Sequence, residues 1–221
     1  MALSPDGRTL ATPSEDTGEG DREQKRTGTE HGTGSVPISL WDVATGREVR
    51  RLKGHPRLFT GFGRSNLESY THFGFLQRIH SLSFSADGRT LASASDEEIV
   101  RLWDVASGEE VFPGRALADA VGPLLFTPDG GTLVAGGMDG SLRFCDPRTG
   151  AVRRRLAAHA TRVASMAVTA DGTTLVTASE NGPARVWDVA TGRKVRERRA
   201  AYDAQCIPLS ISATRFLTAN A

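Results

Sequence analysis

Apolar and small polar residues alternate in short runs along most of this 221-residue chain. The runs SLSFS (81–85), TLASAS (90–95) and IVRLWDV (99–105) have the period of two that half-buried β-strands show. An Asp-Gly pair separates the first two runs, and a Ser-Gly pair follows the third. Glycine accepts the positive φ that such turns need. The pattern predicts short antiparallel strands joined by tight turns.

The same unit returns every 42 residues, and three independent landmarks keep that step. The first is a leucine after the Asp-Gly turn, at Leu91, Leu133, Leu175 and Leu217. The second is the Asp-Gly pair itself, at 87–88, 129–130 and 171–172. The third is a pair at the end of the third run, at Trp103-Asp104, Cys145-Asp146 and Trp187-Asp188. Four short strands in a unit of about 40 residues, repeated along a chain, are typical of a β-propeller blade.

Three parts of the chain share this unit: SFSADGRTLASASDEEIVRLWDVASGEEV (83–111), VTADGTTLVTASENGPARVWDVATGRKV (168–195), and SPDGRTLAT (4–12) with ISLWDVATGREVRRLKGH (38–55). On these residues the units resemble WD repeats. The resemblance implies an all-β β-propeller of four-stranded antiparallel blades, with about four blades plus a partial fifth in an open or fragmentary ring. We expect the blades at about 1–53, 79–115, 121–157 and 163–199, with the partial one at 207–221.

An incomplete propeller leaves an apolar blade face uncovered. About 400 Å² of such surface costs about 10 kcal/mol at ~25 cal/mol per Å², which is comparable with the whole net stability of a domain, about 5–15 kcal/mol. We therefore expect a truncated product, a partner chain or self-association that closes the ring, or an unusual four-blade closure. Truncation is the first of these expectations.

The resemblance further implies a buried network of histidine, hydroxyl, aspartate and tryptophan in each blade. Blade four matches best, although asparagine stands where the family prefers aspartate: His159, Thr177 (or Ser179), Asn181 and Trp187. The other blades keep only parts of the network. These parts are Trp41 in blade one, Trp103 in blade two with Phe75 at the histidine position and Glu97 at the acidic one, and Asp139 in blade three with Leu117 and Cys145 in place of histidine and tryptophan.

Three catalytic or ligand-binding sites could be considered for this sequence: a hydrolase triad, a metal site and a phosphate-binding loop. The sequence argues against each of them. A hydrolase triad would not recur at a core position in every blade. His31, His55, His72 and His80 lack the spacing of close metal ligands, and the GxG stretches at 18–20 and 61–63 have no following helix or lysine to cradle a phosphate. We expect no enzyme activity, no cofactor and no metal, with Cys145 as a small buried hydrophobe.

Charge and composition narrow the partners. Twenty-seven basic residues face 26 acidic ones, so no global field attracts nucleic acid or a membrane. The basic stretches at 153–155 and 193–199 fall on predicted outermost strands, where charge prevents edge-to-edge pairing. Two distant cysteines predict no disulfide framework, and no signal peptide or spanning segment is seen, so a cytoplasmic location is expected.

Two insertions depart from the repeat. The first (13–35) has no aliphatic residue and no phenylalanine, tyrosine or tryptophan, and it is expected to be disordered. The second (56–78) is rich in aromatic residues, and both should project from one side of blades one and two. We predict a protein-interaction scaffold, with a partner-binding loop carried by Phe59, Phe62, Arg64, Tyr70 and Phe73. The alternative for this segment is a local flap. The alternatives for the chain are a truncated remnant without independent function and a regulatory or sensor propeller of a multidomain signalling enzyme.

Overall fold

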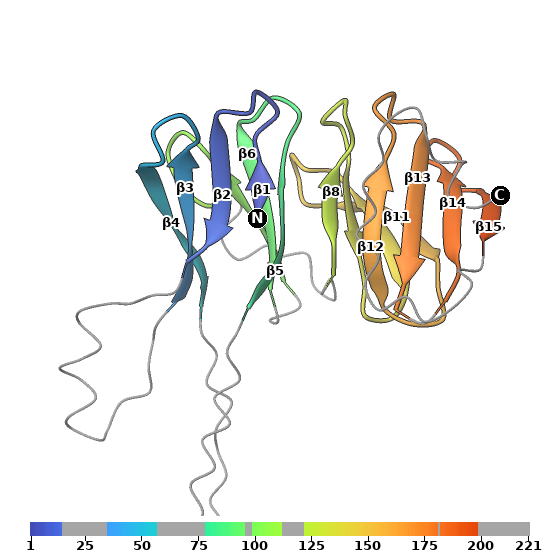
Figure 1. Cartoon of the computed structure of the whole chain (residues 1–221). Coiled ribbons are helices and arrows are strands. Elements are labelled where there is room, and N and C mark those ends of the chain that lie inside the picture. Colours follow the sequence, from blue (N-terminus) through green and yellow to red (C-terminus); the bar gives the residue numbers. More distant parts are fainter. Residues whose placement is uncertain (15–34, 57–77, 96–98, 112–121, 181, 199–221) are drawn as a thin grey trace, which may run out of the picture.

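The structure used here is a computed structural model, and it describes residues 1–14, 35–56, 78–95, 99–111, 122–180 and 182–198. The regular secondary structure of these residues consists of β-strands alone. The strands form four antiparallel sheets that stand side by side (Figure 1). The expectation of an all-β fold built from propeller blades is confirmed.

Within each sheet the strands follow one another in chain order. The first sheet contains β1 (Ala2–Leu3), β2 (Thr9–Pro13), β3 (Ser35–Asp42) and β4 (Glu48–Pro56). The second contains β5 (Ile79–Phe84), β6 (Thr90–Ser95) and β7 (Val100–Asp104). The third contains β8 (Leu124–Phe126), β9 (Leu133–Gly136), β10 (Ser141–Cys145) and β11 (Val152–Ala157). The fourth contains β12 (Val163–Val168), β13 (Thr174–Ser179), β14 (Ala184–Asp188) and β15 (Lys194–Arg198).

The second sheet departs from the expected four strands. It has three strands, followed by a bridge between Trp103 and Glu110 and a hydrogen bond of 2.8 Å from the Val111 amide to the Leu102 carbonyl. The fourth strand expected near 110–115 is thus begun in the described part, and 112–121 lie outside it. The predicted partial fifth blade at 207–221 also lies outside the described residues.

The four sheets stack in a row through three apolar layers. The first strands of successive sheets, β1, β5, β8 and β12, contact each other, as the innermost strands of propeller blades do. Among the described strands no pairing joins the first sheet to the fourth, so the row is open at both ends.

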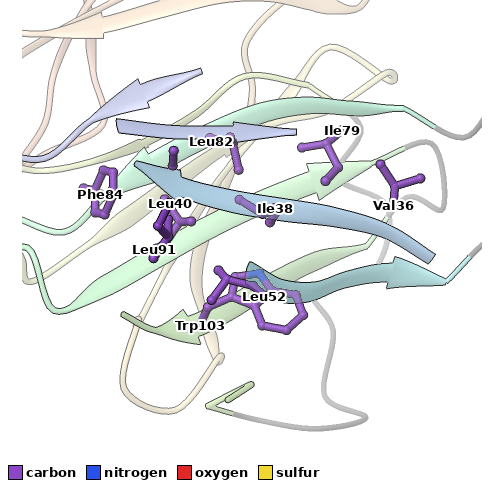
Figure 2. Packing of buried hydrophobic residues seen from close by; sticks show 10 residues of the cluster. Val36, Ile38, Leu40, Leu52, Ile79, Leu82, Phe84, Leu91 and Trp103 are labelled. Atoms are coloured by element: carbon purple, nitrogen blue, oxygen red, sulfur yellow. The ribbon is translucent and has the colours of Figure 1, made fainter. Parts of the chain in front are cut away.

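Each apolar layer takes side chains from two neighbouring sheets. The first layer joins Ile38, Leu40 and Leu52 of the first sheet to Leu91 and Trp103 of the second, as Figure 2 shows. The second layer joins Ala92, Ala94, Val100 and Leu102 to Leu124, Phe126, Leu133, Ala135 and Cys145. The third layer joins Val134, Leu142, Phe144 and Ala158 to Val163, Leu175 and Trp187. Because no sheet buries its own faces, stability comes from the stacking of neighbours.

Aspartates close the turns between the first and second strands of every sheet. Each accepts a hydrogen bond of 2.5–2.6 Å from a serine or threonine hydroxyl two residues earlier and a second bond from a backbone amide two residues later. The hydroxyl bond is the main reason that the pKa of each carboxyl lies below its ordinary value. The four are Asp6, Asp87, Asp129 and Asp171. The glycine that follows each aspartate has a φ of 68–72°.

Gly54 lets β4 bulge and turn the next side chain into the core. The register shifts between Val36 and Ile38, which pair with His55 and Leu52, so two residues of β4 oppose one of β3. Gly54 has a φ of 70°, and a Cβ built there would lie 1.8 Å from the Val36 carbonyl oxygen. A bulge of this kind, with glycine in the left-handed region, redirects the following residue. Here that residue is His55.

We expect Gly54→Ala to lower the free energy of unfolding by about 2 kcal/mol or more, because backbone strain of about 1–3 kcal/mol is joined by a clash with a fixed carbonyl. Urea unfolding followed by tryptophan fluorescence measures this loss. Gly7→Ala is the matched control: Gly7 has a φ of 71°, but nothing lies within 4 Å of its added Cβ. Equal losses in the two variants would show that the Val36 contact contributes nothing.

Candidate functional site

A buried cluster of polar side chains lies between the first and second sheets. His55 is completely buried, with its Nε2 atom 2.8 Å from Ser93 Oγ and its Nδ1 atom 2.8 Å from Ser95 Oγ. Trp103 Nε1 donates to the same Ser93 oxygen at 2.8 Å. The cluster therefore ties β4 of one sheet to β6 and β7 of the next.

Burial keeps His55 neutral. Loss of hydration is the main cause that lowers its pKa to about 3, and the nearby Arg101 guanidinium adds to this. A neutral imidazole offers one donor and one acceptor, which suits two hydroxyl partners. The sequence prediction placed Phe75 at this histidine position. That assignment is wrong, because the structure places His55 there. The 56–78 insertion lies between His55 and the rest of its repeat, so counting back from Trp103 along the chain does not reach the histidine.

The fourth sheet repeats this arrangement with His159, Thr177 and Trp187. His159 Nε2 lies 2.7 Å from Thr177 Oγ1, and Trp187 Nε1 donates to the same oxygen at 2.9 Å. Burial is again the main cause that lowers the histidine pKa, here to about 4. The predicted position Asn181 lies outside the described residues. Thr177, rather than Ser179, makes the contact.

The remaining predicted network residues have other partners. Trp41 Nε1 donates to Thr12 Oγ1 at 2.8 Å. Asp139 accepts the Ser141 amide at 2.9 Å and pairs with Arg155 and, at 3.6 Å, with Arg143. In the third sheet an Arg–Asp–Arg group therefore stands where the resemblance implies a histidine–tryptophan network.

The geometry of these clusters argues against hydrolysis. The hydroxyls of Ser93 and Thr177 and the two imidazoles are buried between sheets, so a substrate carbonyl cannot reach them. Each hydroxyl also accepts a tryptophan N–H bond. Within the described ranges, no group of three or more His, Cys, Asp or Glu side chains could hold a metal ion. Those ranges also contain no helix long and apolar enough to cross a membrane.

Cys145 lies at the tryptophan position of the third sheet and is completely buried in the second apolar layer. Burial raises the pKa of its thiol to about 11. Because the thiolate is the reactive form, we expect Cys145 of the folded Cys206→Ser variant to react with an aromatic disulfide reagent at pH 8 at least about a hundred times more slowly than in denaturant. Absorbance of the released thiolate follows the reaction. Equal rates in folded and denatured protein would contradict the burial.

The basic stretches lie on the outer edge strands β11 and β15, as expected. Many of these side chains pair with carboxylates of their own sheet: Arg153 with Asp146, Arg155 with Asp139, and Lys194 with Glu197 at 2.7 Å. Internal pairing reduces the charge that a nucleic acid would meet, and it fits the reading of these strands as protected edges.

Both insertions leave from the same end of the first two sheets. The ends of β2 at Pro13, β4 at Pro56 and the starts of β3 at Ser35 and β5 at Ile79 lie together at the lower end in Figure 1. This end lies opposite the aspartate turns. The predicted partner-binding residues Phe59, Phe62, Arg64, Tyr70 and Phe73 lie outside the described residues, so their role stays a prediction.

Comparison with known proteins gives two matches. The family described as WD domain, G-beta repeat (WD40) matches residues 67–104, 117–146 and 150–188. A curated protein of Dictyostelium discoideum, "Anaphase-promoting complex subunit cdc20", is 32% identical over a 97-residue alignment that covers 34% of this chain and 19% of that protein. The chain thus matches about a fifth of that relative's length.

The bounds of the third matched segment show why the histidine and the tryptophan of one cluster come from neighbouring sheets. It begins near the outer strand β11 of one sheet and ends with β14 of the next. One repeat therefore spans two sheets, and its histidine and tryptophan, His159 and Trp187, meet across the boundary between them. His55 and Trp103 do the same at the first boundary, between the first and second sheets.

Proposed function

Because this chain carries WD40 repeats, we propose that it is a non-catalytic module that binds other proteins. The observation that carries the proposal is the match of three repeats to a stack of sheets whose polar groups are used to join the sheets to each other. Such a stack supplies a rigid frame on which loops can present binding side chains. The cdc20 relative is described as a subunit of a complex, which supports the same class of function.

We place the partner contact on the 56–78 segment. Pro56 follows directly on the buried His55, and Ile79 begins β5 with a side chain that is 9% exposed, so both ends of the segment are fixed to the frame. The aromatic residues and Arg64 in this segment are the types that most often anchor protein interfaces. A cytoplasmic location is part of the same proposal.

The test replaces Phe59, Phe62 and Tyr70 with alanine in the whole chain. Immobilised wild-type chain and the triple variant are exposed to lysate of the source cells, and bound proteins are quantified by mass spectrometry. We expect at least a tenfold loss of specifically bound proteins with an unchanged melting temperature. Val49→Ala, at an exposed apolar position of β4, is the matched control and should bind as wild type does.

Two outcomes would overturn the proposal. A lowered melting temperature with unchanged capture would make the segment a flap over the sheets. Absence of any specifically captured protein by a folded wild-type chain would remove the interaction function itself. Circular dichroism and size-exclusion chromatography on the same samples establish that the chain is folded.

A further inference from the structure

The three internal boundaries between sheets follow one rule. The face of a sheet that carries its tryptophan (Cys145 in the third sheet) is called its tryptophan face, and it packs against the preceding sheet. The opposite face packs against the following sheet. At the first boundary, Trp103 and Leu91 meet Leu40 and its apolar neighbours. At the third, Trp187 and Leu175 meet Leu142 and Phe144.

The first sheet presents a tryptophan face with no described sheet in front of it. Leu10 pairs with Trp41 in the same register in which Leu91 pairs with Trp103. Trp41 and Leu10 are half-buried, and Leu3 is 55% exposed, whereas Trp103 is 2% exposed. We call Leu3, Leu10 and Trp41 the open tryptophan face.

The fourth sheet carries, on β14 and β15, the kind of face that packs against a tryptophan face at the internal boundaries. Counting back from the Trp-Asp pair, Ala184 and Val186 of β14 stand where Ile38 and Leu40 stand in β3. Both are half-buried, while Val176 on β13 is already buried. Within the described residues, the part of this face that is left for contact is therefore on β14 and β15.

An arginine bond reinforces two of the internal boundaries. Arg50 Nη1 donates at 2.9 Å to the Ser107 carbonyl in the turn after Trp103-Asp104. Arg154, stacked 4.3 Å above the Phe144 ring, donates to the Val189 and Ala190 carbonyls at 2.5 and 3.0 Å in the equivalent turn of the fourth sheet. These arginines also help to lower the pKa values of the Asp104 and Asp188 carboxyls, after the hydrogen bonds within each turn.

The arginine and the turn that form this bond each occur once more, the arginine on the fourth sheet and the turn on the first. Arg196 pairs with Val186 as Arg50 pairs with Leu40, so it holds the same place on its edge strand, and it is exposed. At the other end, the Asp42 carboxylate accepts bonds from the Thr45 amide and hydroxyl at 2.7 and 2.6 Å. Among the described residues, no arginine helps to lower the pKa of the Asp42 carboxyl, whereas Arg50 and Arg154 do so for Asp104 and Asp188.

We propose that two copies of this chain bind head to tail: the open tryptophan face of one copy packs on β14 and β15 of the other, whose Arg196 reaches the turn after Trp41-Asp42. The contact reproduces between copies the outer part of the boundary that the chain already builds within itself, where the arginine of one sheet meets the turn of the next. A contact between two different surfaces is heterologous, so it continues into a closed ring or an open chain of copies. The proposal rests on the sheet boundaries and is independent of the proposed partner binding.

A disulfide trap tests the geometry. Thr45→Cys and Arg196→Cys are made separately in a Cys206→Ser background, where the remaining native thiol, Cys145, is buried. We expect a disulfide-linked dimer on non-reducing gels when the two variants are mixed under mild oxidation, and no such dimer from either variant alone. A dimer from either variant alone would indicate a face-to-face contact and overturn the proposal, as would no dimer from the mixture.

Sedimentation velocity measures the strength of the contact. The average mass should rise above 23.6 kDa as the concentration of wild-type chain increases, and Arg196→Glu should weaken the association at least tenfold. Val195→Glu is the control because Val195 is adjacent on β15 and 65% exposed. A mass of 23.6 kDa at every concentration would mean that another occupant, such as a further blade, covers the face. That result would overturn the proposal and leave the partner-capture test unaffected.

Discussion

Replacing Trp103 with alanine is expected to lower the free energy of unfolding by about 3–5 kcal/mol. The side chain is 2% exposed, fills the layer between the first and second sheets beside Leu52, and donates the N–H bond that holds Ser93 (Figure 2). Its removal leaves a cavity and takes one bond from the His55 cluster. Urea unfolding at neutral pH, followed by far-ultraviolet circular dichroism, gives the difference.

Trp41→Ala is the matched control for this experiment. Trp41 occupies the same place in its repeat and makes an equivalent N–H bond, to Thr12, but it lies on the open tryptophan face and is half-buried. We expect a loss of about 1 kcal/mol at a dilution where copies do not associate, since the exposed part of the ring contributes little burial. Equal losses of unfolding free energy in the two variants would show that another group covers the face of the first sheet that carries Trp41.

Acidification from pH 8 to pH 5 is expected to lower the free energy of unfolding by about 4 kcal/mol, about 2 kcal/mol for each of His55 and His159. Burial lowers the pKa of these imidazoles to about 3 and about 4 in the folded chain, against 6.5 for the ordinary value. The unfolded chain therefore binds protons first. The histidine contribution to stability is present above pH 6.5 and is lost as the pH falls toward the folded pKa values. Urea midpoints at half-unit steps of pH measure this slope.

A non-titrating variant isolates each histidine. His159→Gln keeps a side-chain amide near Thr177 but carries no proton equilibrium, so its stability should fall about half as steeply between pH 8 and pH 5. Below about pH 4 the turn aspartates add a further loss of the same sign, because their pKa values are also lowered in the folded chain. A wild-type slope in His159→Gln would show that its imidazole is hydrated.

Local chemistry made the strands and turns predictable from the sequence. The alternation in TLASAS (90–95), the Asp-Gly pairs and the Trp-Asp pairs act within a few residues, because a strand has a period of two and a turn needs a particular φ. The repeat then implied stacked sheets, and the resemblance implied the contact of His159, Thr177 and Trp187. These features depend on residues whose spacing the chain repeats.

The His55 cluster could not be read from spacing, because an insertion separates this histidine from its partners in the chain. Only the folded sheets bring His55 to Ser93 and Ser95. The same holds for the arginine bonds across the sheet boundaries, from Arg50 to Ser107 and from Arg154 to Ala190. The sequence indicated these arginines only as charged edge residues.

The sequence by itself determined the all-β fold, the turns and the repeated unit, since each follows from the conformational preferences of neighbouring residues. Tertiary structure alone decided which tryptophans are buried and which histidine completes each boundary. Those properties depend on whether another sheet stands against a given face, and Trp41 and Trp103 differ in that respect although they share the motif Leu-Trp-Asp-Val. Burial belongs to the stack of sheets, and a single repeat does not encode its place in that stack.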